Sequence, residues 1–255
     1  MSKMEIIPND SILFRSAVDA LKEFLPEAQI QVKPTCVVIC GMDRSHVGFV
    51  HYQLAKADCK VLKVTGSQTI GMNLNSLSRV LSYVGSGDSI RLTLNKAGDR
   101  LVIQTTNEKV GKKAVYELAL MEITEDAVEL PDLTYGAKVV AKTADIAGVI
   151  KEVGTFGDAV TMTLDGAGFT LTATGDMGSA KQTLENTEDR DMDLSEDSVT
   201  ATFATKYISG IMKGGAALSG TTTLEFDSSA QPLRATFRYG TDSVFIAYQA
   251  PKIVD

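Results

Sequence analysis

Much of the chain alternates between apolar and polar residues with a period of two, which is the pattern of strands that bury one face. Clusters of Gly, Asn, Asp and Ser, such as NKAGD and DGAG, separate these alternating stretches. The combination is typical of short antiparallel strands joined by hairpin turns. The clearest predicted strands are residues 90–94, 100–105, 160–164, 169–175, 199–204, 222–227 and 244–248.

Four segments instead repeat their apolar residues at the spacing of one helix face, so they predict amphipathic helices. These segments are residues 11–25, 74–84, 143–155 and 203–213. We expect N-caps at Ser11 and Thr143, because a hydroxyl there would accept a bond from a free backbone N–H. Glycine favours the conformation that ends a helix, and it follows three of the segments, at Gly85, Gly154 and Gly214.

The order of elements repeats along the chain, as helix, strands, helix, strands in each half. The helices of the first half begin at residues 11 and 74, and those of the second at 143 and 203. This near-constant offset indicates an internal duplication. The stretch between the halves is acidic, contains Pro131 and has weak periodicity. We therefore expect two similar domains, residues 1–120 and 137–255, joined by a surface linker, residues 121–136.

Composition limits the class of protein. The chain has 255 residues, of which 44% are hydrophobic, so a folded protein with a sizeable core is expected. Cysteines occur only at positions 36, 40 and 59. Their odd number favours free thiols in a reducing compartment. The sequence shows neither an apolar run long enough for a membrane helix nor the apolar core of a secretory signal, so we expect no membrane association.

The formal net charge is −7, which taken alone argues against binding to nucleic acid. The four predicted helices differ from the rest, because together they carry more basic than acidic side chains on their solvated faces. Arg15 and Lys22 are seven positions apart, as are Lys206 and Lys213, so each pair shares one helix face. The excess is only a few charges, so taken alone it favours the interpretation that these are the ordinary solvated faces of amphipathic helices.

The histidines lie close together, in and just after CGMDRSHVGFV, and suggest three kinds of site. Cys36, Cys40, His46 and His51 have zinc-ligand side chains, but their spacing is too short for a known zinc finger. Nucleophilic catalysis is also disfavoured, because neighbouring side chains such as Ser45 and His46 point to opposite faces of extended chain. The remaining alternatives are a pocket for a partner and an ordinary packed loop.

Five stretches stand out in order along the chain: MDRSHVGFV (42–50), IGMNLNSLSRVL (70–81), ELPDLTY (129–135), GDAV (157–160) and YQAPKIVD (248–255). MD-x-SHV and APKI are specific in combination. With them, the chain resembles the eukaryotic and archaeal sliding clamp family, proliferating cell nuclear antigen, over essentially its whole length. The resemblance implies an α+β fold of duplicated DNA-clamp domains, with antiparallel sheets outside and two helices per domain lining a ring channel.

The resemblance also implies that three subunits close head to tail into a ring, with strand 115–121 of one subunit pairing with 175–184 of the next. This assigns Tyr116, Leu118, Gly175, Met177, Gly178 and Lys181 to the subunit interface. The helices would face duplex DNA, which assigns seven basic residues to the channel. They are Arg15, Lys22, Arg79, Lys109, Lys151, Lys206 and Lys213. Ser82 and Gly148 stand where the family has basic channel residues.

The loop, the linker and the C-terminal tail would together form one pocket for short peptides of partner proteins. The resemblance places thirteen residues there: Met42, His46, Val47, Phe49, Val128, Leu130, Pro131, Tyr135, Pro232, Tyr248, Ala250, Pro251 and Ile253. His46 is then a pocket-wall residue rather than a catalyst. The turn LDGAGF (164–169) lacks the lysine that eukaryotic clamps carry for ubiquitin-type modification.

By resemblance, the expected function is a homotrimeric processivity factor without enzymatic activity, cofactor or metal. It would encircle double-stranded DNA without regard to sequence. Its partners would be DNA polymerase, the clamp loader, flap nuclease and ligase, and its site of action the nucleus if the cell is eukaryotic. Three alternatives stay open at this point: a subunit of a heterotrimeric clamp, a monomeric processivity factor that does not close into a ring, and a small-molecule enzyme.

Overall fold

The computed structural model describes residues 4–124, 130–228 and 231–252. It divides into two compact units, each described here by itself. Unit 1 comprises residues 1–44, 50–128 and 239–245, and unit 2 comprises residues 45–49, 129–238 and 246–255. Each unit therefore includes a short segment from the other half of the sequence. The domain boundaries expected at residues 120 and 137 stay a prediction.

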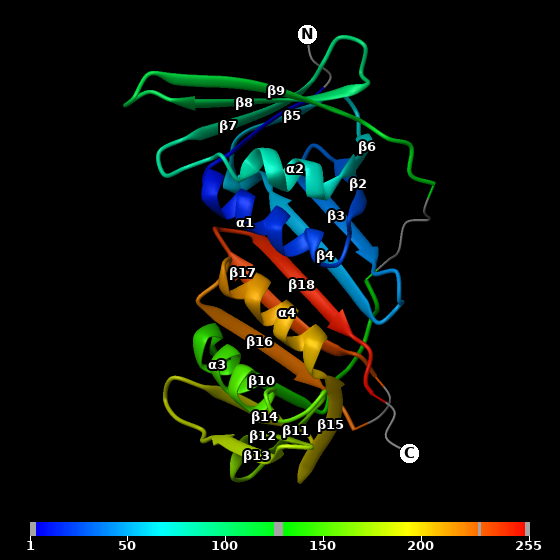
Figure 1. The fold of residues 1–255 in the computed structure, drawn as a ribbon, viewed down its shortest axis with the longest axis vertical. Coiled ribbons are helices and arrows are strands. Elements are labelled where there is room, and N and C mark those ends of the chain that lie inside the picture. The colour runs from blue at the N-terminus through cyan, green and yellow to red at the C-terminus, as the bar shows by residue number, and fades with distance from the viewer. Residues whose placement is uncertain (1–3, 125–129, 229–230, 253–255) are drawn as a thin grey trace. The chain divides into compact units, whose positions relative to one another are not determined.

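Unit 1 contains two antiparallel sheets and two α-helices (Figure 1). One sheet has the strand order β5-β1-β7-β8-β9, and β2 lies between β3 and β6 in the other. The elements are β1 (Met4–Pro8), α1 (Ser11–Lys22), β2 (Glu27–Val32), β3 (Cys36–Met42), η1 (Lys56–Asp58), β5 (Cys59–Val64), β6 (Gln68–Asn73), α2 (Leu74–Leu81), β7 (Ser89–Leu94), β8 (Arg100–Asn107) and β9 (Lys112–Ala119).

Unit 2 repeats this plan, with one sheet in the order β13-β12-β11-β15 and another that contains β14-β10-β16-β17. Strands β4 (Gly48–Ala55) and β18 (Ser243–Gln249) have residues in both units. The other elements are β10 (Ala137–Lys142), α3 (Thr143–Val153), β11 (Ala159–Asp165), β12 (Gly168–Gly175), β13 (Gly178–Leu184), β14 (Asp191–Leu194), β15 (Ser198–Ala204), α4 (Thr205–Ala216), β16 (Thr221–Phe226) and β17 (Leu233–Tyr239).

The core of each unit is built from the apolar faces that the sequence pattern predicts. In unit 1, Phe14 of α1 and Leu77 of α2 are buried with Ile6 of β1. In unit 2, the ring centroids of Phe169 on β12 and Phe226 on β16 lie 5.9 Å apart, so the two sheets share one core. Paired helices α1 with α2 and α3 with α4 contact each other in their own units. Burial of these apolar faces is the main favourable term in folding.

The structure confirms the predicted α+β class, the four helices and the seven predicted strands, with ends that shift by a few residues. None of the helices in the described part of the chain is long and apolar enough to cross a membrane. The helix periodicity succeeds because each helix packs one apolar face on a sheet, as the burial of α1 and α4 shows.

The predicted helix caps were mostly wrong. Asp10, not Ser11, is the N-cap of α1, and its carboxylate accepts bonds from the N–H groups of Ile12 and Leu13. The hydroxyl of Ser11 instead accepts a bond from Ile90 N at 3.2 Å. Lys142, without a side-chain cap bond, precedes α3 in place of the predicted Thr143.

At the C-terminal ends, only Gly154 is the cap that the sequence suggests. Helix α2 is capped by Ser82, before Gly85, and α4 continues through Gly214 to Ala216. The reason for this continuation is tertiary packing, because the last turn of α4 lies against β17. A Cβ atom on Gly215 would overlap the ring of Phe237, so only glycine allows this close approach.

Replacing Gly215 with Ala should lower the free energy of unfolding by about 1–3 kcal/mol, because the added methyl group overpacks the contact with Phe237. Urea denaturation would measure the change. Gly210 on the same helix is the matched control, since a Cβ there meets no atom within 4 Å. Gly210→Ala should stabilise by about 0.4–1 kcal/mol. A Gly215→Ala variant as stable as the parent would contradict this account of the packing.

Candidate functional site

The loop within MDRSHVGFV is a turn whose shape is fixed by bonds inside unit 2. His46 has a φ of 56°, in the left-handed region that histidine tolerates better than most residues. The hydroxyls of Ser45 and Tyr207 on α4 lie 2.8 Å apart. Ala250 N donates to Val47 O at 2.8 Å, which joins the loop to the C-terminal segment. The expectation of extended chain at Ser45 and His46 was therefore wrong, because both residues lie in this turn.

The C-terminal segment is itself held in place. Lys252 N donates to Thr202 O at 2.8 Å, and the side-chain amide of Gln249 donates to Ala204 O at 2.9 Å. Both acceptors are on β15. The segment that carries Ala250 and Pro251 therefore lies between the loop and β15.

An aromatic pair lies directly beneath this segment. The rings of Phe49 and Tyr248 are tilted against each other with centroids 5.7 Å apart. Phe49 is 6% exposed and Tyr248 is 4% exposed. Burial raises the pKa of Tyr248, partly offset by its hydrogen bond with Arg234. The two rings support the site from inside and offer a ligand little surface of their own.

The end of the linker is fastened by Arg234 on β17. Its guanidinium lies 4.8 Å from the ring centroid of Tyr135, and it donates through Nε and Nη2 to the two carboxylate oxygens of Glu225 at 2.6 and 2.5 Å. These bonds raise the pKa of Arg234, and burial raises that of Tyr135. Next to them, Gly136 N donates to Asp227 Oδ2 at 2.8 Å. Tyr135 is thus held by a charged pair on the neighbouring strands.

Sequence reasoning missed Arg234. Its signal is the hairpin register, because Glu225 and Arg234 are direct partners across β16 and β17. Cross-strand partners of opposite charge stabilise a sheet. The same residues border an open cavity of about 440 Å³, lined by Tyr135, Lys138, Asp193, Glu225 and Arg234 among others.

The predicted pocket residues fall into four groups. Leu130 is 41% exposed, Pro131 and His46 are exposed, and Met42, at the end of β3 in unit 1, is 39% exposed. Phe49 and Tyr248 are buried. Val128 and Ile253 lie outside the described residues. The half-buried members are Val47, Tyr135, Pro232, Ala250 and Pro251. A backbone hydrogen bond joins Val47 to Ala250, and a ring contact joins Phe49 to Tyr248.

The predicted interface residues lie on, or next to, the terminal strands of two sheets. Strand β9 ends the first sheet of unit 1, and β13 ends one sheet of unit 2 (Figure 1). Tyr116 on β9 stacks against Tyr83, with centroids 6.4 Å apart, and Leu118 is half-buried. Gly175 and Gly178 pair across the β12–β13 turn, beside Met177, which is 72% exposed. Lys181 is exposed on β13.

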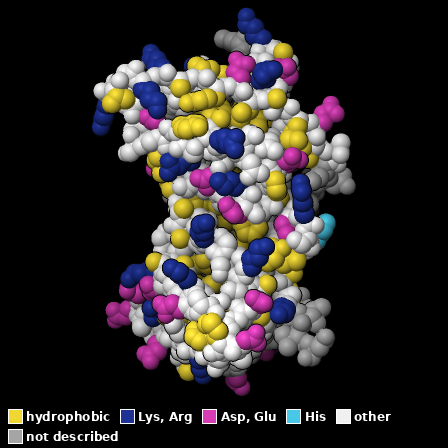
Figure 2. All heavy atoms as spheres, viewed as in Figure 1, with side chains coloured by type: hydrophobic (Ala, Val, Ile, Leu, Met, Phe, Trp, Pro, Cys, Tyr) yellow, Lys and Arg dark blue, Asp and Glu magenta, His cyan; other side chains and the backbone are white. Residues whose placement is uncertain are grey.

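Six of the seven predicted DNA-facing residues lie on helices. Arg79, Lys151, Lys206 and Lys213 are exposed on α2, α3 and α4, whereas Arg15 and Lys22 on α1 are half-buried. Lys109 is exposed in the turn between β8 and β9. Figure 2 shows Lys and Arg side chains over the face that carries the helices.

Two of the alternatives raised by the sequence, a metal site and a reactive cysteine, can be compared with the described residues. Among them, no group of three His, Cys, Asp or Glu side chains could hold a metal ion. Burial raises the pKa of the Cys59 thiol to about 11 and also raises that of Cys40, so their thiolates are scarce at neutral pH. Burial lowers the pKa of His51.

Comparison with known proteins identifies the family. The profile of the N-terminal domain of proliferating cell nuclear antigen matches residues 4–129, and that of the C-terminal domain matches residues 129–253. The chain belongs to the proliferating cell nuclear antigen family. Its structure is also similar to the crystal structure of proliferating cellular nuclear antigen from Entamoeba histolytica, with a TM-score of 0.91 and 26% sequence identity. That match covers 99% of this chain and 100% of the other. The resemblance noted from the motifs is confirmed.

Removing Arg234 should loosen the linker end in this member of the family. Arg234→Ala leaves the half-buried carboxylate of Glu225 without its partner and uncovers the Tyr135 ring, so we expect unfolding to become easier by about 2–4 kcal/mol. Thermal and urea unfolding would measure this. Arg238→Ala, at an exposed position on the same strand, should stay within about 0.5 kcal/mol of the parent. Equal stability of the two variants would refute the fastening role.

Proposed function

We propose that this chain is a DNA sliding clamp, in which three copies close head to tail into a ring around duplex DNA. The observation that carries the proposal is a terminal strand in each unit, β9 and β13, with a free edge among the described residues. A sheet edge presents unpaired backbone groups that readily pair with another strand. Because the two edges differ, β9 of one subunit can pair with β13 of the next, which is a heterologous contact. Repeating such a contact produces a closed ring when the rotation between neighbouring subunits divides a full turn evenly.

Side chains on both edges support this pairing. Val115 on β9 is 61% exposed and Met177 before β13 is 72% exposed, so each edge offers apolar surface that a partner strand would cover. The family supplies the number of subunits and the direction of closure. In the proposed ring, the six domains place their helices around the channel, and the acidic remainder of the surface faces outward.

The clamp performs no chemistry in this proposal. It holds DNA by topology, so contacts with phosphates need only be weak and independent of sequence. This lets the ring slide with a polymerase and keep the enzyme on its template. The protein would act wherever DNA is replicated, which in a eukaryotic cell is the nucleus.

Partner proteins would dock at the loop and C-terminal segment described above. Exposed Leu130 and half-buried Val47 and Pro251 supply apolar contacts at a site whose shape is fixed by hydrogen bonds. A peptide that places an aliphatic and an aromatic anchor in such a site concentrates its binding energy there. Polymerase, clamp loader, flap nuclease and ligase are the proposed owners of such peptides.

Edge-directed variants test the head-to-tail pairing. Val115→Asp with Ala119→Asp places charge along β9, and Met177→Asp with Ser179→Asp does so at β13, all at exposed positions that should leave each unit folded. Each double variant alone should be monomeric by light scattering, since it keeps only one working edge. Mixed together, they should form a dimer and no trimer, because one intact pair of edges remains.

Val110→Asp, at a 72% exposed apolar residue outside both strands, is the control and should keep the mass of the parent. If either double variant kept the parent's mass on its own, the head-to-tail proposal would fail.

Peptide docking is tested separately. Pro251→Ala with Ile253→Ala should weaken binding of a Q-x-x-hydrophobic-x-x-aromatic-aromatic peptide by tenfold or more, since hot-spot side chains contribute about 1.4 kcal/mol or above. Titration calorimetry would give the affinity, and light scattering should show an unchanged oligomer. Unchanged affinity would sink the pocket assignment.

A further inference from the structure

We infer that the helices of unit 2 provide most of the charge that holds the DNA, and that Lys22 of unit 1 contacts no phosphate. This inference rests on the proposed function, because it concerns which side chains meet the duplex in the channel. It changes the assignment that family resemblance gives, in which Arg15, Lys22, Arg79, Lys151, Lys206 and Lys213 act alike. The contacts of each side chain separate them.

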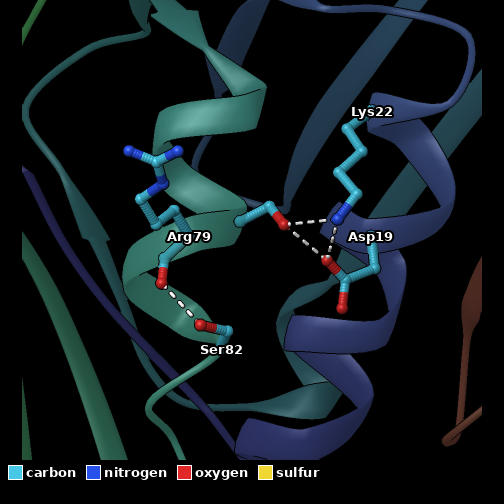
Figure 3. Close-up of polar contacts among 5 residues, drawn as sticks. Asp19, Lys22, Arg79 and Ser82 are labelled. Carbon is cyan, nitrogen blue, oxygen red and sulfur yellow. Dashed lines mark hydrogen bonds and ion pairs between the residues drawn. The ribbon is translucent and has the colours of Figure 1, made fainter.

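Lys22 is already engaged inside unit 1 (Figure 3). Its Nζ donates to Asp19 Oδ1 at 2.9 Å, one turn earlier on α1, and to Ser78 Oγ on α2 at 2.7 Å. The Ser78 hydroxyl in turn donates to the same Asp19 oxygen at 2.6 Å. The three groups form a closed triangle that joins α1 to α2. A phosphate would have to compete with this carboxylate for the ammonium group.

The two arginines of unit 1 differ from each other. Arg15 Nη1 donates to Val84 O at 2.7 Å, just beyond the end of α2, where the carbonyl groups carry partial negative charge. This bond fixes the guanidinium against the protein. Arg79 is exposed on α2 and has no side-chain hydrogen bond or ion pair with the described residues (Figure 3). In unit 1, Arg79 is therefore the helix cation best placed to meet DNA.

Helix α3 of unit 2 differs from α1, because its two acidic side chains bind residues outside the helix and not its own lysine. Asp145 pairs with Arg190 at 3.1 Å, and Glu152 accepts a bond from the side chain of Gln182. Lys151 makes no ion pair with the described residues and is exposed. The acidic side chains of α3 thus face β13 and the segment after it, and they leave the lysine to the solvent.

Helix α4 carries no acidic residue at all. Lys206 and Lys213 lie on one face, are exposed, and make no ion pair with the described residues. Together with Lys151, they give unit 2 three unneutralised helix cations, against Arg79 and the fixed Arg15 in unit 1. Since phosphate binding releases counterions, each free cation that meets DNA should add to the salt dependence of binding, and Lys22 should not.

Salt titrations of a fluorescein-labelled linear duplex, followed by fluorescence anisotropy with the full-length protein, test this directly. Lys206→Ala, Lys213→Ala and Lys151→Ala should each flatten the slope of log K against log salt by about 0.9 for every subunit of the ring in which that lysine meets a phosphate. Lys22→Ala should leave the slope within error of the parent. Lys138→Ala, a lysine paired with Asp193 on a strand, is the control for loss of an ion-paired lysine.

Asp19→Asn should change the salt dependence of DNA binding in the opposite direction to the lysine substitutions. Releasing Lys22 from its carboxylate should steepen the slope by about 0.9 for every subunit in which the freed lysine meets a phosphate, and it should tighten binding; the gain should vanish when Lys22→Ala is added. This double-mutant cycle separates the release of Lys22 from the simple removal of an acid near DNA. An equal gain in both backgrounds would overturn the inference.

The remaining outcomes are also distinguishable. A Lys22→Ala variant that loses as much slope as Lys206→Ala would overturn the inference and leave the clamp proposal intact. A parent protein with no salt-dependent duplex binding at any salt concentration would overturn the DNA contact of the proposed function itself, and this inference with it.

Discussion

Backbone groups at an open sheet edge need hydrogen-bond partners, and this requirement organises the whole molecule. Each unit ends one of its sheets in a terminal strand, β9 or β13, whose outer side is unpaired among the described residues. Both strands alternate half-buried and exposed positions to their ends. A protein that leaves such edges open invites uncontrolled pairing. The proposed head-to-tail pairing of β9 with β13 would satisfy both edges with one kind of contact and, on closure, would leave neither of these two edges free.

The paired helices of each unit complement its sheets. A sheet also needs its apolar face covered, and the paired helices of each unit help to do this with their own apolar sides. Their other sides are left for the channel of the proposed ring. In the proposed ring, topology would retain the DNA, so a few unneutralised lysines would be enough although the net charge of the chain is negative.

Residues near the C-terminal end contribute both to the stability of unit 1 and to the candidate pocket of unit 2. Buried Asp58 accepts bonds from Thr241 N at 2.6 Å, Asp242 N at 3.1 Å and the Ser243 hydroxyl at 2.6 Å, all inside unit 1. Burial alone would raise the pKa of Asp58, but these bonds outweigh it and hold the pKa below its usual value. A few residues later, Tyr248 near the end of β18 and Ala250 just after it contribute to the candidate pocket in unit 2. Residues 241–250 thus contribute to the stability of unit 1 and to the candidate docking site in unit 2.

Local pattern was sufficient to predict the helices and the alternating strands, because apolar periodicity is what a shared core demands. The motifs around His46 and Pro251 were sufficient to indicate the family. Contacts between distant residues were not predictable. The cap of α1, the Arg234 to Glu225 pair and the Lys22 to Asp19 triangle depend on register and on neighbours brought close by folding. The lysine triangle shows the consequence, since equal charges along the sequence have unequal freedom in the structure.

The central claim is that the chain closes a ring by pairing with itself, and the mass of the purified protein in solution tests it most directly. Light scattering over a range of concentrations should give about three times the 27.3 kDa of one chain, with no larger open-ended species. A mass of 27.3 kDa at every concentration would contradict self-closure, because both edges would then remain unpaired in the free protein.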